Sequence, residues 1–141
     1  MNNMFEMDSW SKRKQAMFQH VEASACDRAR WISTNLYYHK RDVAYLNFIL
    51  SKDCSVLDIG CGNGWLLGQL NAKVKCGVDL SPSMVDIARE TCPEATVIQA
   101  DIESRSDLKK IKNQGRFDYI ILSDTLAFLD DIEVGLSLIH F

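Results

Sequence analysis

The chain has 141 residues, of which 47% are hydrophobic and 25% are charged, and its formal net charge at pH 7 is −3. This length and composition indicate one globular domain with enough apolar residues for a core. The negative balance excludes a nucleic-acid surface built on bulk positive charge. The sequence contains no run of 18 apolar residues that would predict a membrane span, and its N-terminus lacks the basic start and apolar stretch of a secretion signal. We therefore expect a cytoplasmic protein.

The number and spacing of the cysteines indicate whether their thiols are reduced or paired in disulfides. There are five, at positions 26, 54, 61, 76 and 92, and no two of them have Cys-x-x-Cys spacing. An odd number without that spacing favours reduced thiols over a disulfide framework or a zinc site. We expect no metal centre.

The first third of the chain is predicted to be helical. Ser9 or Ser11 can cap a first helix, which runs with a break toward Leu36. A second helix, from about Tyr38 to Leu50, repeats apolar residues on one face. Such a helix can lie against a sheet edge or cover a ligand site.

The stretch from Cys54 to Leu67 reads Cys-Ser-Val-Leu-Asp-Ile-Gly-Cys-Gly-Asn-Gly-Trp-Leu-Leu. Its first half is the short apolar run of a buried parallel strand, and a helical period resumes at Trp65. The three glycines between them, Gly60, Gly62 and Gly64, can take positive φ and place no Cβ between the main chain and a ligand. A strand, a glycine turn and a helix form the first half of a βαβ unit. We therefore expect a nucleotide-like ligand above the carboxyl end of this strand.

The spacing of the glycines argues against two common nucleotide loops. A dinucleotide-binding loop, Gly-x-Gly-x-x-Gly, would need glycine at position 65, where the chain has Trp65. A Walker loop would need a following Gly-Lys-Ser/Thr triplet, which is not there.

The second strand is predicted over Lys73 to Asp79 and ends in an acid 19 positions after Gly60. At that distance a carboxylate can accept hydrogen bonds from the hydroxyls of a ribose placed over the first turn. Ser81 is the expected N-cap of the next helix, and Pro82 occupies its first position, where the missing N–H has no cost.

Two more strands complete the predicted sheet. The third spans Ala95 to Ala100 and is followed by Asp101, which can face a ligand at the strand end or cap the next helix. The fourth, from Phe117 to Ser123, is the most apolar segment and is followed by Asp124. A final amphipathic helix is expected from about residue 130.

Several of these segments resemble motifs of the class I S-adenosylmethionine-dependent methyltransferases. Val-Leu-Asp-Ile-Gly-Cys-Gly-Asn-Gly closely resembles the family's first motif, the second strand with Ser-Pro-x-Met its second, and Phe-Asp before an apolar run its fourth. The resemblance implies a three-layer α/β fold with a doubly wound, mostly parallel sheet, and S-adenosylmethionine as the cofactor. It also implies a division into a helical lead-in, 1–37, and a cofactor-binding core, 38–141.

The resemblance also implies a set of cofactor-binding residues. Asp79 would hold the ribose, Leu80 and Met84 would flank the adenine, and Asp101 would accept from the adenine amino group, with the Ile102 N–H meeting a ring nitrogen. Including the glycine loop and the end of the fourth strand, the implied set is Asp58, Gly60, Cys61, Gly62, Gly64, Asp79, Leu80, Met84, Asp101, Ile102 and Ser123.

The segment before the first strand has two interpretations. Tyr38 and Arg41 belong to a polar and aromatic cluster that can be a solvated turn, with the tyrosine rings lying on the core. In many methyltransferases of this type the same segment caps the cofactor. On that interpretation Tyr38 or Arg41 closes over it, and Arg41 pairs with its carboxylate.

Catalysis by such a fold needs few residues. Methyl transfer from a sulfonium is an in-line displacement, so the protein's main task is to align two reactants, and a base is needed only when the acceptor must lose a proton. Many relatives with small-molecule acceptors have Glu-His after the fourth strand, where this chain has Ala127 and Phe128. Asp124 is the remaining carboxylate in that region and is our candidate catalytic residue.

The resemblance covers about residues 38–135 and four strands, whereas family members usually continue with a fifth strand and a carboxyl-terminal hairpin. It therefore implies an incomplete C-terminal half and an open edge at the fourth strand, where a partner or a second copy can pair. We expect a methyltransferase with a small-molecule acceptor. The alternative is a non-catalytic cofactor-binding module, or a fragment, that acts through a partner.

Overall fold

The computed structural model describes residues 7 and 9–138 of the chain. Its helices are α2 (Lys12–Ser24), α3 (Arg28–Thr34), α4 (Leu36–Ile49), α5 (Trp65–Gln69), α6 (Pro82–Thr91), α7 (Arg105–Lys112) and α8 (Ile132–Leu138), with 3-10 turns η1 (Ala25–Asp27) and η2 (Leu126–Phe128). Its strands are β1 (Ser55–Ile59), β2 (Val74–Asp79), β3 (Thr96–Gln99) and β4 (Tyr119–Ile121).

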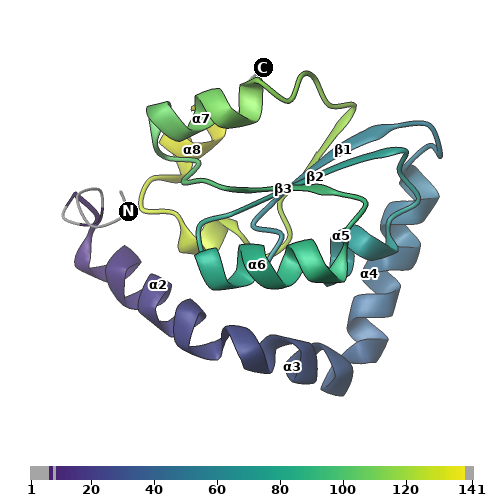
Figure 1. The fold of residues 1–141 in the computed structure, drawn as a ribbon, viewed down its shortest axis with the longest axis horizontal. Helices are drawn as coiled ribbons and strands as arrows, with labels where there is room; N and C mark the ends of the chain where they lie inside the picture. Colours follow the sequence, from purple (N-terminus) through teal and green to yellow (C-terminus); the bar gives the residue numbers. More distant parts are fainter. Residues whose placement is uncertain (1–6, 8, 139–141) are drawn as a thin grey trace.

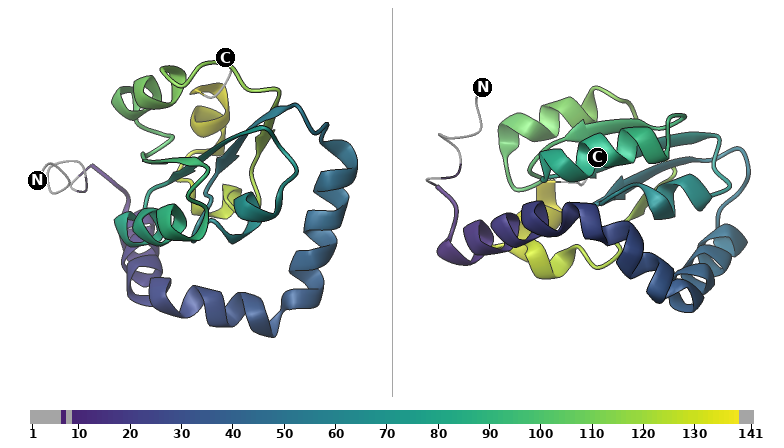
Figure 2. Two further views of the ribbon diagram at one scale, coloured as in Figure 1. Left: turned by 45° about the vertical axis from the view of Figure 1, so that its right-hand side comes forward. Right: turned by 60° about the horizontal axis from the view of Figure 1, so that its bottom comes forward.

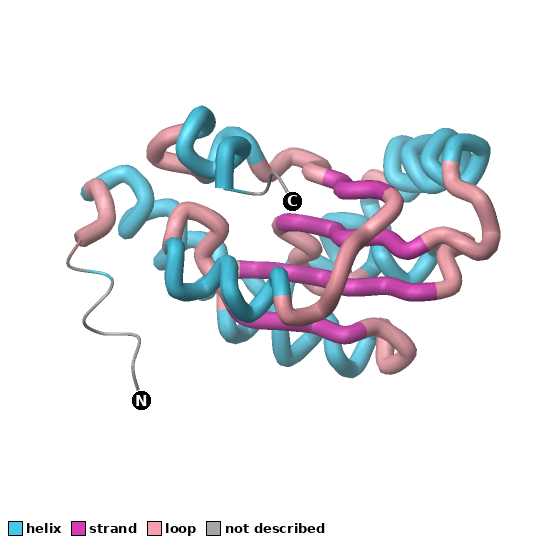
Figure 3. Tube along the Cα trace, turned by 90° about the horizontal axis from the view of Figure 1, so that it is seen from above, coloured by secondary structure: helices cyan, strands magenta, loops and turns pink. Residues whose placement is uncertain are grey.

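The four strands form one parallel sheet in the order β3-β2-β1-β4. Helices α5 and α6 lie on one face of the sheet and α7 and α8 on the other (Figure 1). Figure 3 shows the strands side by side from above, with β4 at one edge and β3 at the other. The predicted three-layer α/β architecture with a parallel sheet is confirmed.

Alternation along β1 divides its side chains between the two faces of the sheet. Leu57 and Ile59 pack in one cluster with Leu108 and Ile111 of α7, which lies on that face. Val56 packs in a second cluster, which includes side chains of α4 and α5 on the opposite face. Because side chains alternate with a period of two, Asp58 shares the face of Val56 and is directed toward the side of the sheet that α5 covers. The strand order and this alternation together place an acid beside the glycine loop.

The three N-terminal helices form an arc around one end of the sheet and along the α5 side (Figures 1 and 2). The N-cap of α2 is Ser11, whose Oγ accepts from Lys14 N at 3.0 Å. The predicted break in the first helix is η1, which separates α2 from α3. Helix α4 begins at Leu36, two residues before its predicted start.

β4 is shorter than the predicted strand because only three of its residues pair with β1. Tyr119, Ile120 and Ile121 are in register with Val56, Leu57 and Asp58. Within the described part of the chain no strand pairs with the outer side of β4, so its edge is open. The edge residue Ile120 is exposed.

None of the helices in the described part of the chain is long and apolar enough to cross a membrane.

Candidate cofactor site

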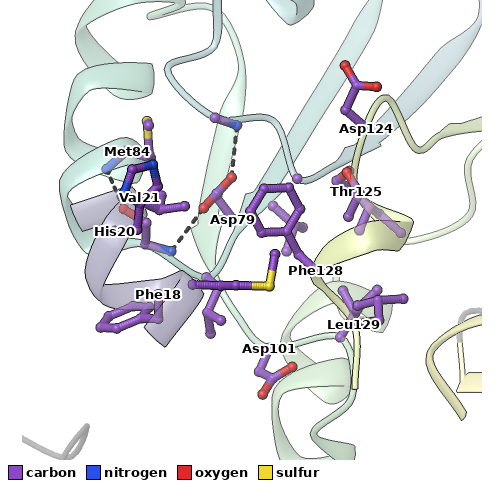
Figure 4. Close-up of a pocket in the computed structure, with 18 of the residues that line it drawn as sticks. Phe18, His20, Val21, Asp79, Met84, Asp101, Asp124, Thr125, Phe128 and Leu129 are labelled. Carbon is purple, nitrogen blue, oxygen red and sulfur yellow. Dashed lines mark hydrogen bonds between the residues drawn. The ribbon is translucent and has the colours of Figure 1, made fainter. Parts of the chain in front are cut away.

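A cavity of about 450 Å³ lies where the carboxyl ends of the strands meet the N-terminal helices (Figure 4). The sheet side contributes the glycine loop and the segments that follow β2, β3 and β4. The opposite wall comes from α2 and α3. Figure 4 shows Phe18 and Val21 of α2 across from Phe128 and Leu129, with Asp79 between them. Ligands of doubly wound sheets bind at this end of the strands.

The glycine loop has the conformation that its sequence predicts. Gly60, Gly62 and Gly64 have φ values of 77°, 54° and 76°. The N–H groups of Gly60 and Cys61 donate to Val78 O at 2.7 and 3.0 Å, which fixes the loop on β2.

Two of these glycines have different spatial roles. A Cβ on Gly62 would meet no atom within 4 Å, so this part of the loop presents bare main chain to open space. A Cβ on Gly64 would lie 3.0 Å from Cα and Cβ of Ala88. Gly64 therefore permits close packing of the loop on α6, and its contribution to a ligand site is indirect.

Asp79 links the glycine loop to the start of α6. Its Oδ2 accepts from Gly62 N at 2.8 Å and its Oδ1 accepts from Ser81 N at 2.9 Å. Burial raises the pKa of Asp79, and the backbone hydrogen bonds act in the opposite direction. A carboxylate has about four lone-pair positions, so Asp79 retains capacity for ligand hydroxyls. Leu80 and Met84, also predicted, line the same cavity.

Ser81 is the N-cap of α6, as predicted. Its Oγ accepts from Met84 N at 3.0 Å.

Asp101 lies at the cavity, but its carboxylate is engaged by the chain itself. Lys14 Nζ donates to both of its oxygens, at 3.0 and 2.8 Å, and Glu103 N donates to Oδ1 at 2.9 Å. The expected role toward an adenine amino group therefore stays a prediction. Ile102, the other predicted residue of this segment, is buried and lines the cavity.

A smaller cavity of about 60 Å³ adjoins the glycine loop. Two buried side-chain atoms that lack any hydrogen-bond partner belong to residues that line it, namely Asp58 Oδ1 and His39 Nε2. Burial, with a further contribution from the charge of Asp79, raises the pKa of Asp58 to about 7. Unpaired buried polar atoms are costly, so this cavity is suited to a ligand with a donor for the carboxyl group and an acceptor for the imidazole.

The structure does not bring Tyr38 and Arg41 to either cavity. Tyr38 is 70% exposed, and Arg41 donates to Tyr37 Oη at 3.2 Å on the outer side of α4. Helical geometry explains the difference, because the neighbouring positions His39 and Asp42 are the ones that line the smaller cavity.

Arg28 is the cation that lines both cavities. Its guanidinium lies 4.4 Å from the ring centre of Trp31. Burial lowers the pKa of Arg28, whereas the charges of Asp124 and Asp79 raise it. The sequence offered no periodic or motif signal for Arg28, which follows the 3-10 turn between α2 and α3.

Ser123 and Asp124 lie at the rim shared by both cavities. Asp124 has a φ of 57°, a left-handed conformation that is uncommon outside glycine and is often found at functional sites. The next residue holds this turn in place, since Thr125 Oγ1 donates to Ile59 O at 2.7 Å. In Figure 4 the Asp124 carboxylate lies apart from the apolar wall that Phe128 and Leu129 form.

Cys61 lies in the loop and is buried. Burial, and then the charges of Asp58 and Asp79, raise the pKa of its thiol. We expect iodoacetamide at pH 8 to modify the exposed Cys26 and to leave Cys61 unmodified, because the thiolate is the reactive form. Peptide mass spectrometry checks this, with guanidinium-unfolded protein as the control in which all five cysteines react. Rapid alkylation of Cys61 in the native protein would contradict this prediction and would show that its thiol is accessible and ionised.

No group of three or more His, Cys, Asp or Glu side chains within residues 7 and 9–138 is arranged to hold a metal ion.

The chain is similar in sequence to one methyltransferase and in fold to two others. Magnesium-protoporphyrin O-methyltransferase of Rhodobacter capsulatus is 29% identical over 85 residues, which are 58% of this chain and 37% of that protein. Magnesium protoporphyrin IX methyltransferase from Synechocystis, solved with S-adenosylmethionine, has a TM-score of 0.69 and 19% identity, covering 92% of this chain and 71% of the other. N-methyltransferase NodS from Bradyrhizobium japonicum, solved with S-adenosyl-L-homocysteine, has a TM-score of 0.68 and 18% identity, covering 86% and 63%.

At these identities the solved structures establish the fold alone. The chain spans about a third of the length of the curated relatives that it matches. The family assignment rests on a separate comparison, with families of protein domains. Residues 56–140, more than half of the chain, match the family described as "Methyltransferase domain". The match begins in β1, directly before the glycine loop, and includes β2, β3 and β4. The chain therefore belongs to the methyltransferase domain family.

Proposed function

We propose that this chain binds S-adenosylmethionine and transfers its methyl group to a small-molecule acceptor. One observation carries the proposal: two cavities that share lining residues on the glycine loop bring together its bare main chain, Asp79 and two unpartnered buried atoms. A nucleoside with a zwitterionic amino-acid end has the groups that these parts lack.

The residues present fit the two ends of this cofactor. At the nucleoside end, Asp79 has spare acceptor capacity for ribose hydroxyls, and Leu80, Met84 and Ile102 supply an apolar surround for a base. At the amino-acid end, Asp58 Oδ1 would accept from the ammonium group. Arg28 and His39 would donate to the carboxylate, in place of the predicted Arg41.

When bound, the cofactor supplies a methyl group activated by a sulfonium charge. The chain's own residues bind and orient, because alignment of the reactants is the main catalytic requirement. Thr125 holds the turn that places Ser123 and Asp124 at the rim of both cavities. Asp124 is the carboxylate positioned to take a proton from an acceptor that must lose one.

We further propose a cytoplasmic location, as the sequence predicts, on the basis of the cysteines. All five cysteines are free in the structure. Cytoplasmic proteins keep their thiols reduced, whereas secreted domains of this size often use disulfides.

The test is ligand binding with a matched pair of variants. S-adenosylhomocysteine at 100 times its dissociation constant should raise the free energy of unfolding by about 2.7 kcal/mol, and NAD should give no such shift. Asp79→Asn should weaken this binding about 10- to 100-fold, because it removes charge-assisted acceptance. Asp86→Asn makes the same charge change on the exposed face of α6 and should bind as the wild type does. Calorimetry without heat for S-adenosylhomocysteine would refute the proposal.

The open edge of β4 favours a second possibility, in which the domain binds the cofactor and acts through an associated chain. A strand edge with unpaired N–H and C=O groups is a template for pairing with another strand. Exposed Ile120 supplies an apolar contact at that edge. Transfer of a labelled methyl group by the purified chain alone would favour the enzyme, whereas binding without transfer would favour the module.

A further inference from the structure

The strand order indicates the direction in which the proposed cofactor would lie across the ends of the strands. The smaller cavity, which suits the amino-acid end, is lined by residues at the ends of β1 and β4, including Asp58 and Ser123. Asp79, which suits the ribose, is the last residue of β2. Because β3 follows β2 in the order β3-β2-β1-β4, the base would lie toward the end of β3, at Asp101. In Figure 4, Asp124 and Asp101 lie at opposite sides of the view, with Asp79 between them.

A further cavity, of about 290 Å³, lies beyond the end of β3 and against α7. This base-side cavity shares Phe18, Leu80, Ala100 and Asp101 with the larger cavity, so the two adjoin where the base would lie. None of the described residues that line it belongs to the glycine loop or to the turn around Asp124. A methyl acceptor could not use this cavity, because its attacking atom must reach the sulfonium at the other end of the cofactor.

Aromatic and aliphatic side chains form one side of the base-side cavity. The rings of Trp10 and Phe18 meet edge to face, with their centres 5.4 Å apart. Both side chains are half-buried, so each keeps apolar surface that a guest could cover. Leu80 and Ala100 add aliphatic groups at the boundary with the larger cavity. An aryl group placed here would leave water and gain edge-to-face contact with the two rings.

The charged side chains that line the base-side cavity are paired within the chain. The carboxylate of Asp101 accepts from Lys14 at 3.0 and 2.8 Å. Asp107 Oδ2 accepts from Asp101 N at 2.9 Å, and its Oδ1 forms an ion pair with Lys110 at 2.6 Å. The Gln99 amide donates to a main-chain oxygen at 3.4 Å. A polar guest would have to break these pairs, whereas an apolar guest leaves them intact.

We propose that the base-side cavity is a subsite for an aromatic substituent on the adenine base, so that the chain binds adenosyl compounds that carry an arylalkyl group on N6. This inference rests on the proposed function. An adenine with one substituent on N6 keeps one N–H, so the remaining hydrogen stays available to an acceptor in the larger cavity. The half-buried ring of Phe18 lies at the boundary that the substituent would cross.

Two matched ligands test the subsite. S-adenosylhomocysteine and its N6-benzyl derivative differ only in the benzyl group. The derivative should bind the wild type about tenfold more tightly, because its ring leaves water for a cavity lined by aromatic side chains. Isothermal titration calorimetry measures both dissociation constants, and their ratio removes effects that the two ligands share.

Three variants locate the benzyl group. Ser106→Phe, in the first turn of α7, should fill the cavity from an exposed position and remove the preference for the derivative, while the unmodified ligand binds as it does to the wild type. Asn113→Phe adds the same side chain at the exposed C-terminal end of α7, away from the cavity, and should keep the tenfold ratio. Trp10→Ala removes one of the two rings and should lower the ratio.

The outcomes separate this inference from the proposed function. If S-adenosylhomocysteine binds the wild type and the benzyl derivative binds more weakly, the subsite is wrong and the cofactor assignment stands. A derivative that binds Ser106→Phe as tightly as it binds the wild type would place the benzyl group outside the cavity, which also contradicts the subsite. If the folded wild type binds neither ligand, the proposed function fails, and the subsite fails with it. Binding of unmodified S-adenosylhomocysteine by each variant shows that the variant is folded.

Discussion

Between pH 5 and pH 8, the difference in free energy of unfolding between Asp58→Asn and the wild type should shift by about 3 kcal/mol in favour of the variant. Burial raises the pKa of Asp58 to about 7, whereas in the unfolded chain this group has its ordinary value near 3.8. Between these two values the native state binds more protons than the unfolded state, so the wild type loses stability as pH rises. Asparagine has nearly the same shape and does not ionise. Urea unfolding of both proteins at pH 5 and pH 8 measures the difference.

The same group links cofactor binding to proton release. If the cofactor's ammonium pairs with Asp58 Oδ1, binding lowers the pKa of this carboxyl, so at pH 6 S-adenosylhomocysteine should release up to one proton. Calorimetry in two buffers of different ionisation enthalpy measures this number. Methylthioadenosine has no ammonium group and serves as the control that should release none. Equal proton release by the two ligands would place the ammonium away from Asp58, and a flat stability difference would show that the carboxyl is already ionised at pH 5.

The sequence predicted the parts of the structure that depend on local patterns. The pattern of a strand, a glycine turn and a helix around Gly60 predicted β1, its turn and α5. Ser81 and Pro82 predicted the start of α6. Both predictions were possible because caps and turns depend on a few adjacent residues. Asp79 was found from its spacing to the loop, and it does contact the loop, at Gly62 N.

The missed features depend on contacts between distant segments. Lys14 lies 87 residues from Asp101 in the chain, and nothing in either local sequence predicts their ion pair. The outward position of Tyr38 and Arg41 depends on the rotation of α4 about its axis, which the local sequence did not fix closely enough, and no residue of this helix is fully buried. His39 lies one position away, yet it reaches the site that the tyrosine and arginine do not. The half-buried apolar residues of α2 were a usable signal, but in the sequence they resemble an ordinary core face.

Gly60→Ala should destabilise the protein by about 3–5 kcal/mol. A Cβ at this position would lie 2.2 Å from Thr125 Oγ1 and 2.9 Å from its Cγ2, so Thr125 must move and give up its hydrogen bond to Ile59 O. Strained packing costs about 1–3 kcal/mol and a lost hydrogen bond about 1 kcal/mol, and the positive φ of 77° adds about 1 kcal/mol for any residue with a Cβ. Denaturant unfolding at fixed pH measures the loss.

Gly62→Ala, two positions along the same loop, separates these contributions. Its φ is also positive, but its Cβ would meet nothing within 4 Å, so only the backbone strain of about 1 kcal/mol applies. Its added methyl group would instead occupy the open face of the loop, so this variant should stay folded and bind S-adenosylhomocysteine more weakly. Thr125→Ala removes the two closest atoms, and Gly60→Ala should therefore cost less in that background, as a double-mutant cycle would show. Equal losses for Gly60→Ala in both backgrounds would mean that the clash with Thr125 is relieved elsewhere and that the turn carrying Asp124 is not held by this contact.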